Sequence, residues 1–406
     1  MNRETDQESL RRTLWRMVGV ILGVGAALYV LSIYSVATDS DHRSQTGNVV
    51  GVDYSTFHAG ATMLRYRDAD QLYDLEAMTG ILREVRRGPV GLEPTYLNPP
   101  AFAMVLTPFA PLRYEVGLAL WTTLGIVAFF FGLRSIGTTR PAFVLGAVLV
   151  SVPGFIGVTL GQGQFFWAAL YAGVLSRLRA GQATQAGLLA AVLILKPQLL
   201  APIVLWWLID WRRHHRSLVT VAVAASAISL APAVLFPGSY SGYLSMLKAA
   251  SDAFPLNGIP MGVTLRDTVD AFTGGSSVWS GAIVLGGVAV FAIVLVRGVR
   301  SEWGTDVMFI VATVGGLLVI PHLVMYDWVV LVPVGIVFAQ HIPARSVALP
   351  MIIVGLLYTS LFQAAFGIAS FEQFGSSIQI AALVLVSSAV FGVRQILQEP
   401  TSAHMS

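Results

Sequence analysis

A single carboxylate in an apolar setting opens the first long polar stretch of this sequence. Asp53 stands between Val52 and Tyr54, and the polar stretch runs from about residue 37 to residue 97. Apolar surroundings raise the pKa of a carboxyl group and make it a usable general base. Aspartate is also a preferred helix N-cap, so capping of the helix-like stretch at residues 54–66 is the competing interpretation.

Two cationic or ionisable residues could bind an anionic phosphate. Lys196 lies between two apolar runs, where an ammonium group costs a few kcal/mol unless it is paired or close to water. A lysine that extends to the lipid headgroups is the alternative interpretation. His322 could donate to a phosphate oxygen or relay protons, with Tyr326 and Asp327 close enough in sequence to orient it. A histidine bonded to a backbone carbonyl is the alternative there.

Composition sets the kind of molecule that must position these residues. The 406 residues are 55% hydrophobic and only 12% charged, with a mean hydropathy of +0.71. Soluble domains carry about twice that share of charge. Continuous apolar runs recur from Leu14 to Arg394, which predicts an all-α polytopic membrane protein, a single integral membrane domain over residues 1–406.

We predict about 12 transmembrane helices, with short broken helices and a long first extracytoplasmic loop. The loop covers residues 37–114 and contains re-entrant or interfacial helices, because the run at 101–112 is too short to cross a bilayer. A second outer loop covers residues 237–278. Pro197 splits the region 186–209 into two half-length helices that meet at Lys196; one kinked span is the alternative and would invert the topology after it. The predicted spans are residues 14–36, 116–133, 143–160, 165–178, the two half-helices, 218–236, 279–296, 307–320, 328–340, 347–362 and 378–393.

Charge asymmetry orients this arrangement. With both termini cytoplasmic, the short inner loops carry most of the basic residues, as the positive-inside rule requires. Asp53, Gln162, Lys196 and His322 then all fall on the extracytoplasmic side. This convergence predicts one site there.

Several chemistries find no support in the sequence. There is no cysteine, so disulfides and thiolate chemistry are excluded. Phosphate-cradling and zinc-protease motifs are absent. Two Asp-x-Asp patterns, Asp39–Asp41 and Asp68–Asp70, are typical of solvated loop, and the basic residues are too scattered to form a nucleic-acid patch.

The order of the short motifs resembles glycosyltransferase family 87. The motifs are Asp53-Tyr54, Leu72-Tyr73-Asp74, Tyr96-Leu97-Asn98-Pro99-Pro100, Gly161-Gln162-Gly163-Gln164, Lys196-Pro197 and Pro321-His322 with Tyr326-Asp327. The resemblance implies a GT-C-type fold and the transfer of mannose from a polyprenyl-phosphate donor. The mannosyltransferases that extend phosphatidylinositol mannosides in actinobacteria are the nearest comparison within it.

The resemblance also implies roles by position. Asp53 matches the family's catalytic aspartate, and His322 with Lys196 would hold the donor phosphate. Acceptor or sugar binding is expected of Tyr54, His58, Asn98, Gln162, Gln164, Tyr326 and Asp327. Asn98 departs from the aromatic or small residue that many relatives have before Pro-Pro. We expect a glycolipid acceptor, no cofactor and no metal ligands, a monomer, and a location in the bacterial plasma membrane with no nucleic-acid partner.

In the expected reaction, Asp53 accepts the proton of an acceptor hydroxyl that attacks and inverts the anomeric carbon. The run at residues 101–112 would help to hold the prenyl chain. Arabinofuranose or glucose in place of mannose remains open, as does another outer-face transferase such as a polysaccharide ligase. A secondary transporter or lipid flippase also has broken helices and polar intramembrane residues, although its site would lie near the midplane rather than beside a long outer loop.

Overall fold

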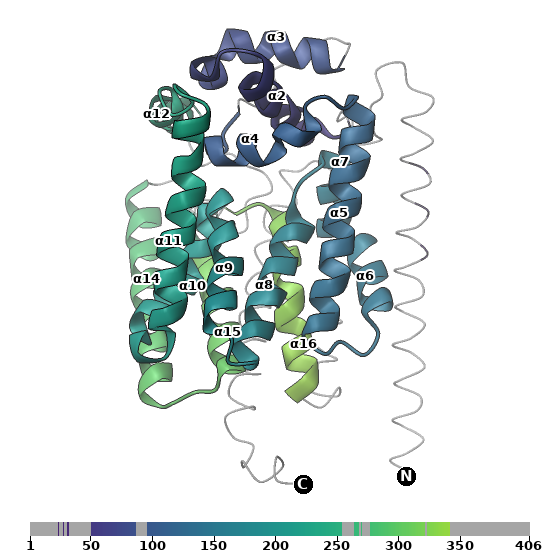
Figure 1. The fold of residues 1–406 in the computed structure, drawn as a ribbon. Helices are drawn as coiled ribbons and strands as arrows, with labels where there is room; N and C mark the ends of the chain where they lie inside the picture. The colour runs from purple at the N-terminus through teal and green to yellow at the C-terminus, as the bar shows by residue number, and fades with distance from the viewer. Residues whose placement is uncertain are drawn as a thin grey trace.

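The computed structural model describes residues 50–86, 96–253, 264–267, 269, 277–320 and 323–341, together with the isolated positions 23, 27 and 31. Over these ranges every regular element is an α-helix or a 3-10 helix. The predicted spans at 347–362 and 378–393, and all but three positions of the one at 14–36, lie outside the described residues. The helices stand side by side as a bundle, with α2, α3 and α4 gathered across one end (Figure 1).

The N-terminal part of the described chain forms the layer across that end. It comprises α2 (Val52–Tyr66), η1 (Ala69–Tyr73), α3 (Leu75–Arg86), α4 (Pro100–Leu106) and η2 (Thr107–Phe109). Helix α2 is buried along most of its length and packs against both α3 and α4. The first loop predicted from the sequence therefore contains helices, and its run at 101–112 includes a short apolar helical segment, Pro100–Phe109.

Three helices among the described residues are long and apolar enough to cross a membrane: α5 (Tyr114–Ser135), α11 (Trp211–Leu235) and residues Gly281–Arg300 of α14 (Ser277–Arg300). A fourth span arises if α6 (Pro141–Leu149) and α7 (Val152–Leu160) count together, although they are bent by 69°. The prediction of one continuous span at 143–160 is corrected here. Ser151 breaks it, because its hydroxyl accepts the N–H of Gly154 and starts α7 afresh.

The remaining helices are shorter than a full span. They are α8 (Gln164–Arg179), α9 (Ala183–Val192), η3 (Leu193–Leu195), α10 (Pro197–Ile209), α12 (Tyr243–Ala253), α15 (Thr305–Val319), η5 (Met325–Leu331) and α16 (Val332–His341). The predicted span at 218–236 begins earlier than expected, because the basic stretch at 211–216 forms the first turns of α11. The predicted span at 328–340 is likewise divided between η5 and α16.

The two half-length helices that meet at Lys196 are confirmed. The Ser217 hydroxyl near the start of α11 donates to the Ala183 carbonyl at the start of α9 at 2.9 Å. Both ends of the α9–α10 hairpin thus lie at the level where α11 begins. Since α10 rises about 1.5 Å per residue over 13 residues, the tip at Lys196 reaches about half-way along the 25-residue α11.

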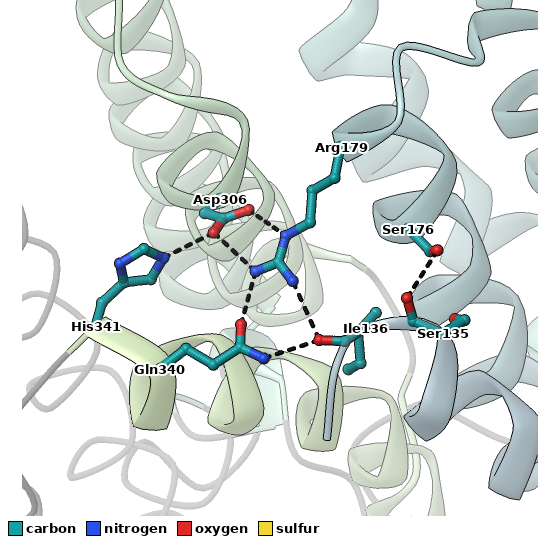
Figure 2. A network of polar contacts seen from close by, with 7 residues as sticks. All are labelled: Ser135, Ile136, Ser176, Arg179, Asp306, Gln340 and His341. Atoms are coloured by element: carbon teal, nitrogen blue, oxygen red, sulfur yellow. Dashed lines mark hydrogen bonds and ion pairs between the residues drawn. The ribbon is translucent and has the colours of Figure 1, made fainter. Parts of the chain in front are cut away.

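A polar network joins four helix ends at the end of the bundle opposite α3 (Figure 2). The Arg179 guanidinium at the end of α8 donates two hydrogen bonds of 2.7 Å to the Asp306 carboxylate at the start of α15. Gln340 and His341 of α16 complete the network, and the carbonyl of Ile136 after α5 accepts from both Arg179 and Gln340. Two-pronged arginine–carboxylate pairing fixes orientation as well as distance, so this network sets the spacing of the helices that carry the site.

Candidate active site

Two glycine turns bring the start of α2 against the end of α7. Gly51 and Gly161 both have φ of +75°, the left-handed conformation that glycine adopts without strain. The Gly51 N–H donates to the Thr159 carbonyl at 2.6 Å. A Cβ added to Gly161 would lie 2.5 Å from the Tyr54 Cβ and 3.3 Å from the Gly51 Cα. Only glycine permits this approach of the two backbones.

The approach places Gln162 on Asp53. The Gln162 Nε2 donates to the Asp53 Oδ2 at 2.6 Å, across 109 residues of sequence. Asp53 lies in the first turn of α2, but the N-cap of that helix is Gly51, and no side chain caps it. The capping interpretation of Asp53 is therefore wrong: its carboxylate is bound to a side chain of another element.

A buried ion pair forms a second part of the site. The Lys196 Nζ lies 2.5 Å from the Asp327 Oδ1 and 5.2 Å from the centroid of the Tyr326 ring. The Lys196 side chain is 14% exposed and that of Asp327 only 2%. Pairing of this kind is what a buried charge requires. The ammonium is also the more accessible partner, with three N–H donors of which Asp327 takes one.

Tyr326 links the Asp53–Gln162 pair to the Lys196–Asp327 pair. Asp53 and Asp327 both lie within electrostatic range of its phenol, and η5, which carries Tyr326, packs against α7 and α8. The structure thus brings together five of the predicted residues, from four separate parts of the sequence: Asp53, Gln162, Lys196, Tyr326 and Asp327. A base, an amide, an ammonium and a phenol in one place suit proton abstraction beside an anionic group.

Gln164 follows Gln162 by two residues and supports the backbone of the turn that carries Gln162. One orientation of the Gln164 amide gives both its nitrogen and its oxygen a hydrogen-bond partner. In that orientation the nitrogen donates to the Gln162 carbonyl at 2.7 Å, and the oxygen accepts from the Val158 N–H at 3.3 Å. The side chain is fully buried. These contacts hold the turn between α7 and α8.

Tyr54 and His58 form an aromatic layer with Tyr114 on the buried side of α2. The Nε2 atom of His58 lies 3.2 Å from the Leu112 carbonyl. Burial lowers the pKa of His58, and its bonds to backbone carbonyls oppose that shift only partly. The Tyr54 hydroxyl has no hydrogen-bond partner among the described residues.

Asn98 lies just before α4, away from Asp53. Its backbone carbonyl accepts from the Tyr73 hydroxyl at 2.8 Å, and the Tyr73 ring lies tilted against that of Tyr96, which packs on Gly60. Gly60 follows Asp53 by seven residues, a rise of about 10 Å along the helix. His322 lies outside the described residues, as does Pro321. The described ranges hold no group of three His, Asp or Glu side chains placed to bind a metal ion.

Two positioning residues were missed by sequence reasoning. Tyr114 donates from its hydroxyl to the carbonyls of both Val50 and Gly51, at 2.8 Å each. Trp121 donates from its indole to the Gly161 carbonyl at 3.2 Å. The only signal for them was aromatic residues with polar tips inside an apolar run, a pattern shared by many residues at membrane interfaces.

The fold and the site define a helical membrane protein with a carboxylate and an ion pair converging from distant parts of the chain. The sequence profile described as Glycosyltransferase family 87 matches residues 96–325. The match covers more than half of the chain, which therefore belongs to this family and is a glycosyltransferase. No curated protein and no solved structure matches the chain.

Proposed function

We propose that this glycosyltransferase moves a sugar, first of all mannose, from a polyprenyl-phosphate donor to a lipid-linked glycan, on the outer face of the bacterial plasma membrane. The observation that supports this reaction best is the meeting of the Asp53–Gln162 pair with the Lys196–Asp327 pair at Tyr326. The first pair can take a proton. The second offers ammonium N–H groups to a phosphate beside it.

Asp53 acts as the general base. An acceptor hydroxyl oxygen attacks the anomeric carbon, the new C–O bond forms as the bond from that carbon to the phosphate oxygen breaks, and the proton passes to Asp53. The electron pair leaves with polyprenyl phosphate. Because phosphate is a good leaving group, one carboxylate suffices, and direct attack from the opposite face inverts the anomeric configuration.

Lys196 stabilises the leaving group. The phosphate of the donor carries one negative charge, and a second develops as the glycosidic bond breaks. An ammonium already in place for that charge lowers the barrier without reorganisation during the reaction. Asp327 keeps the ammonium in position, and His322, expected from the sequence, would contribute a further donor.

The test is transfer by the purified chain in nanodiscs. Polyprenyl-phosphate mannose and a membrane-lipid extract are supplied, and mannolipid product is followed by mass spectrometry. Wild-type protein is expected to form product with inverted anomeric configuration, and Asp53→Asn to lose at least about 99% of the rate, in the range typical for removal of a general base. Donors carrying arabinofuranose or glucose are run in parallel.

Asp68→Asn is the matched control, since it makes the same chemical change at an exposed aspartate just after α2. It is expected to retain full activity. Equal activity of folded Asp53→Asn and wild type would overturn the assignment of the base. Absence of product from every donor would overturn the proposed reaction.

A further inference from the structure

Tyr171 places a buried hydroxyl beside the helix that carries Lys196. It lies about half-way along α8, and its side chain is fully buried. Its hydroxyl donates to the Leu199 carbonyl in the first turn of α10 at 2.6 Å, across 28 residues of sequence. A buried phenol usually finds a hydrogen-bond partner, and here that partner is a backbone atom only three residues after Lys196.

The contact continues to the backbone of Lys196 itself. The Leu199 N–H donates to the Lys196 carbonyl at 2.9 Å. Lys196 is the N-cap of α10, but its side chain makes no capping bond to that helix and is bound to Asp327 instead. The ammonium is therefore held at two points, by Asp327 at the tip of the side chain and by the Tyr171–Leu199 contact at its base.

Two prolines weaken the turn that Tyr171 supports. Pro197 opens α10, and Pro202 lies inside it. Because proline has no N–H, Pro202 cannot donate to the carbonyl of Gln198, four residues before it. The start of α10 is thus held by fewer intrahelical bonds than an ordinary helix, and the Tyr171 hydroxyl adds a bond to it from a neighbouring helix.

Tyr171 also lies close to the partner of the ammonium. Asp327 is within electrostatic range of its phenol, and η5, which carries Asp327, packs against α8. The Tyr171 ring meets that of Phe309 in α15 edge-on, with the ring centroids 6.2 Å apart. One side chain of α8 therefore braces α10 and α15 beside the Lys196–Asp327 pair.

We propose that Tyr171 is a positioning residue for Lys196, whose backbone it fixes so that the ammonium stays aligned with Asp327 and the donor phosphate. Tyr171 touches neither the donor nor the acceptor and acts only through Lys196. Its value for transfer rests on the proposed function, but the placement of Lys196 can be measured without any sugar.

The sequence supplies an internal reference for that measurement, because its two lysines are Lys196 and Lys248. Lys248 is exposed on α12. The full chain in nanodiscs is treated briefly with an amine-acylating reagent, and acylation of the two lysines is compared by mass spectrometry. Tyr171→Phe removes only the hydroxyl. It is expected to raise the ratio of Lys196 to Lys248 acylation about three- to tenfold, as the loss of one neutral hydrogen bond shifts a local opening equilibrium.

Tyr240→Phe is the matched control, since the Tyr240 hydroxyl also donates to a backbone carbonyl, that of Ser229, at 2.5 Å. It is expected to leave the acylation ratio unchanged. An unchanged ratio in Tyr171→Phe, or an equal rise in both variants, would overturn the proposal. Unfolding temperatures are measured alongside. A much larger drop for Tyr171→Phe than for Tyr240→Phe would indicate loss of the fold rather than of one contact, and would also count against it.

Transfer kinetics test the consequence for the reaction. Tyr171→Phe is expected to lower kcat about three- to tenfold and to change KM for the donor by less than about twofold, because the ammonium meets charge that develops after binding. The same substitution should lower kcat by less than about twofold in a Lys196→Arg background but keep its full effect in a Gln162→Leu background. Equal effects in the two backgrounds would show that Tyr171 does not act through Lys196.

The outcomes separate the two proposals. If wild-type protein transfers no sugar, the proposed function fails, while acylation still tests the placement of Lys196. If transfer proceeds and the acylation ratio does not respond to Tyr171→Phe, the role of Tyr171 fails and the proposed function stands.

Discussion

The Gln162 amide donates to the Asp53 carboxylate at 2.6 Å, and two left-handed glycines hold the backbones that carry them. This contact fixes the Oδ2 atom of the proposed base and stabilises its ionised form, since the donor is an N–H group. Gln162 is therefore a positioning residue for Asp53 and does not need to touch a sugar to matter for transfer.

Replacement of Gln162 by leucine should lower kcat/KM about 10- to 100-fold, because a hydrogen bond to a charged group contributes roughly 1.5–3 kcal/mol. Loss of the donor also destabilises the ionised carboxylate, so the acidic limb of the pH–rate profile should move to higher pH. Steady-state kinetics between pH 5 and 9 measures both effects. A lower rate with an unshifted profile would indicate a purely structural role, and Gln162→Asn, which keeps the amide, should restore part of the rate.

Substitutions in the Lys196–Asp327 pair should affect the stability of the fold and the rate of transfer differently. Lys196→Met or Asp327→Leu alone leaves one buried charge uncompensated and should cost roughly 3–5 kcal/mol in unfolding free energy. The double variant should recover most of that loss while transfer stays abolished, because the ammonium is gone. Thermal unfolding in nanodiscs and the mannolipid assay report the two quantities. Recovery of activity in the double variant would contradict the role given to Lys196.

Gly161→Ala should be far more harmful than the same change at Gly181. Both glycines have positive φ, +75° and +69°, so both variants carry backbone strain, of order 1 kcal/mol. An added Cβ at Gly181 meets nothing within 4 Å, whereas at Gly161 it would lie 2.5 Å from the Tyr54 Cβ. Gly161→Ala should therefore separate Gln162 from Asp53 and lower activity at least as much as Gln162→Leu. Comparable activity in the two alanine variants would show that the backbone approach is dispensable.

His58 should make the protein less stable in mild acid. Burial lowers its pKa in the folded protein below the ordinary value of 6.5. Above pH 6.5 the imidazole is neutral in both states. As the pH falls below 6.5 the unfolded chain takes up a proton that folded His58 does not, so stability declines until the folded pKa is passed.

Unfolding temperatures at pH 7.5 and 5.5 test this linkage. His58→Gln should show a smaller difference between the two temperatures than wild type. His215→Gln, at an exposed position of α11, is the control and should behave like wild type. An unchanged difference in His58→Gln would mean that other groups govern the acid response.

Sequence reasoning succeeded where the signal was local. Asp53 and Lys196 stand out as charges among apolar residues, and Pro197 correctly divided the hairpin. It failed where geometry depends on distant segments. The run at 143–160 has the hydropathy of one span, and hydropathy does not register the bend that Ser151 introduces. The bond from Gln162 to Asp53 joins residues 109 apart, and spacing along the chain carries no information about it.

The hairpin has a further consequence for how the chain is made. Lys196 enters the bundle on two half-helices, but its partner Asp327 follows 131 residues later. At about 5–20 residues per second, ribosomes need roughly 7 to 26 s to produce that partner. An unpaired ammonium is costly at membrane depth, so the hairpin tip should settle only after η5 has emerged. Assembly of the candidate site is then a late event that waits for the second half of the polypeptide.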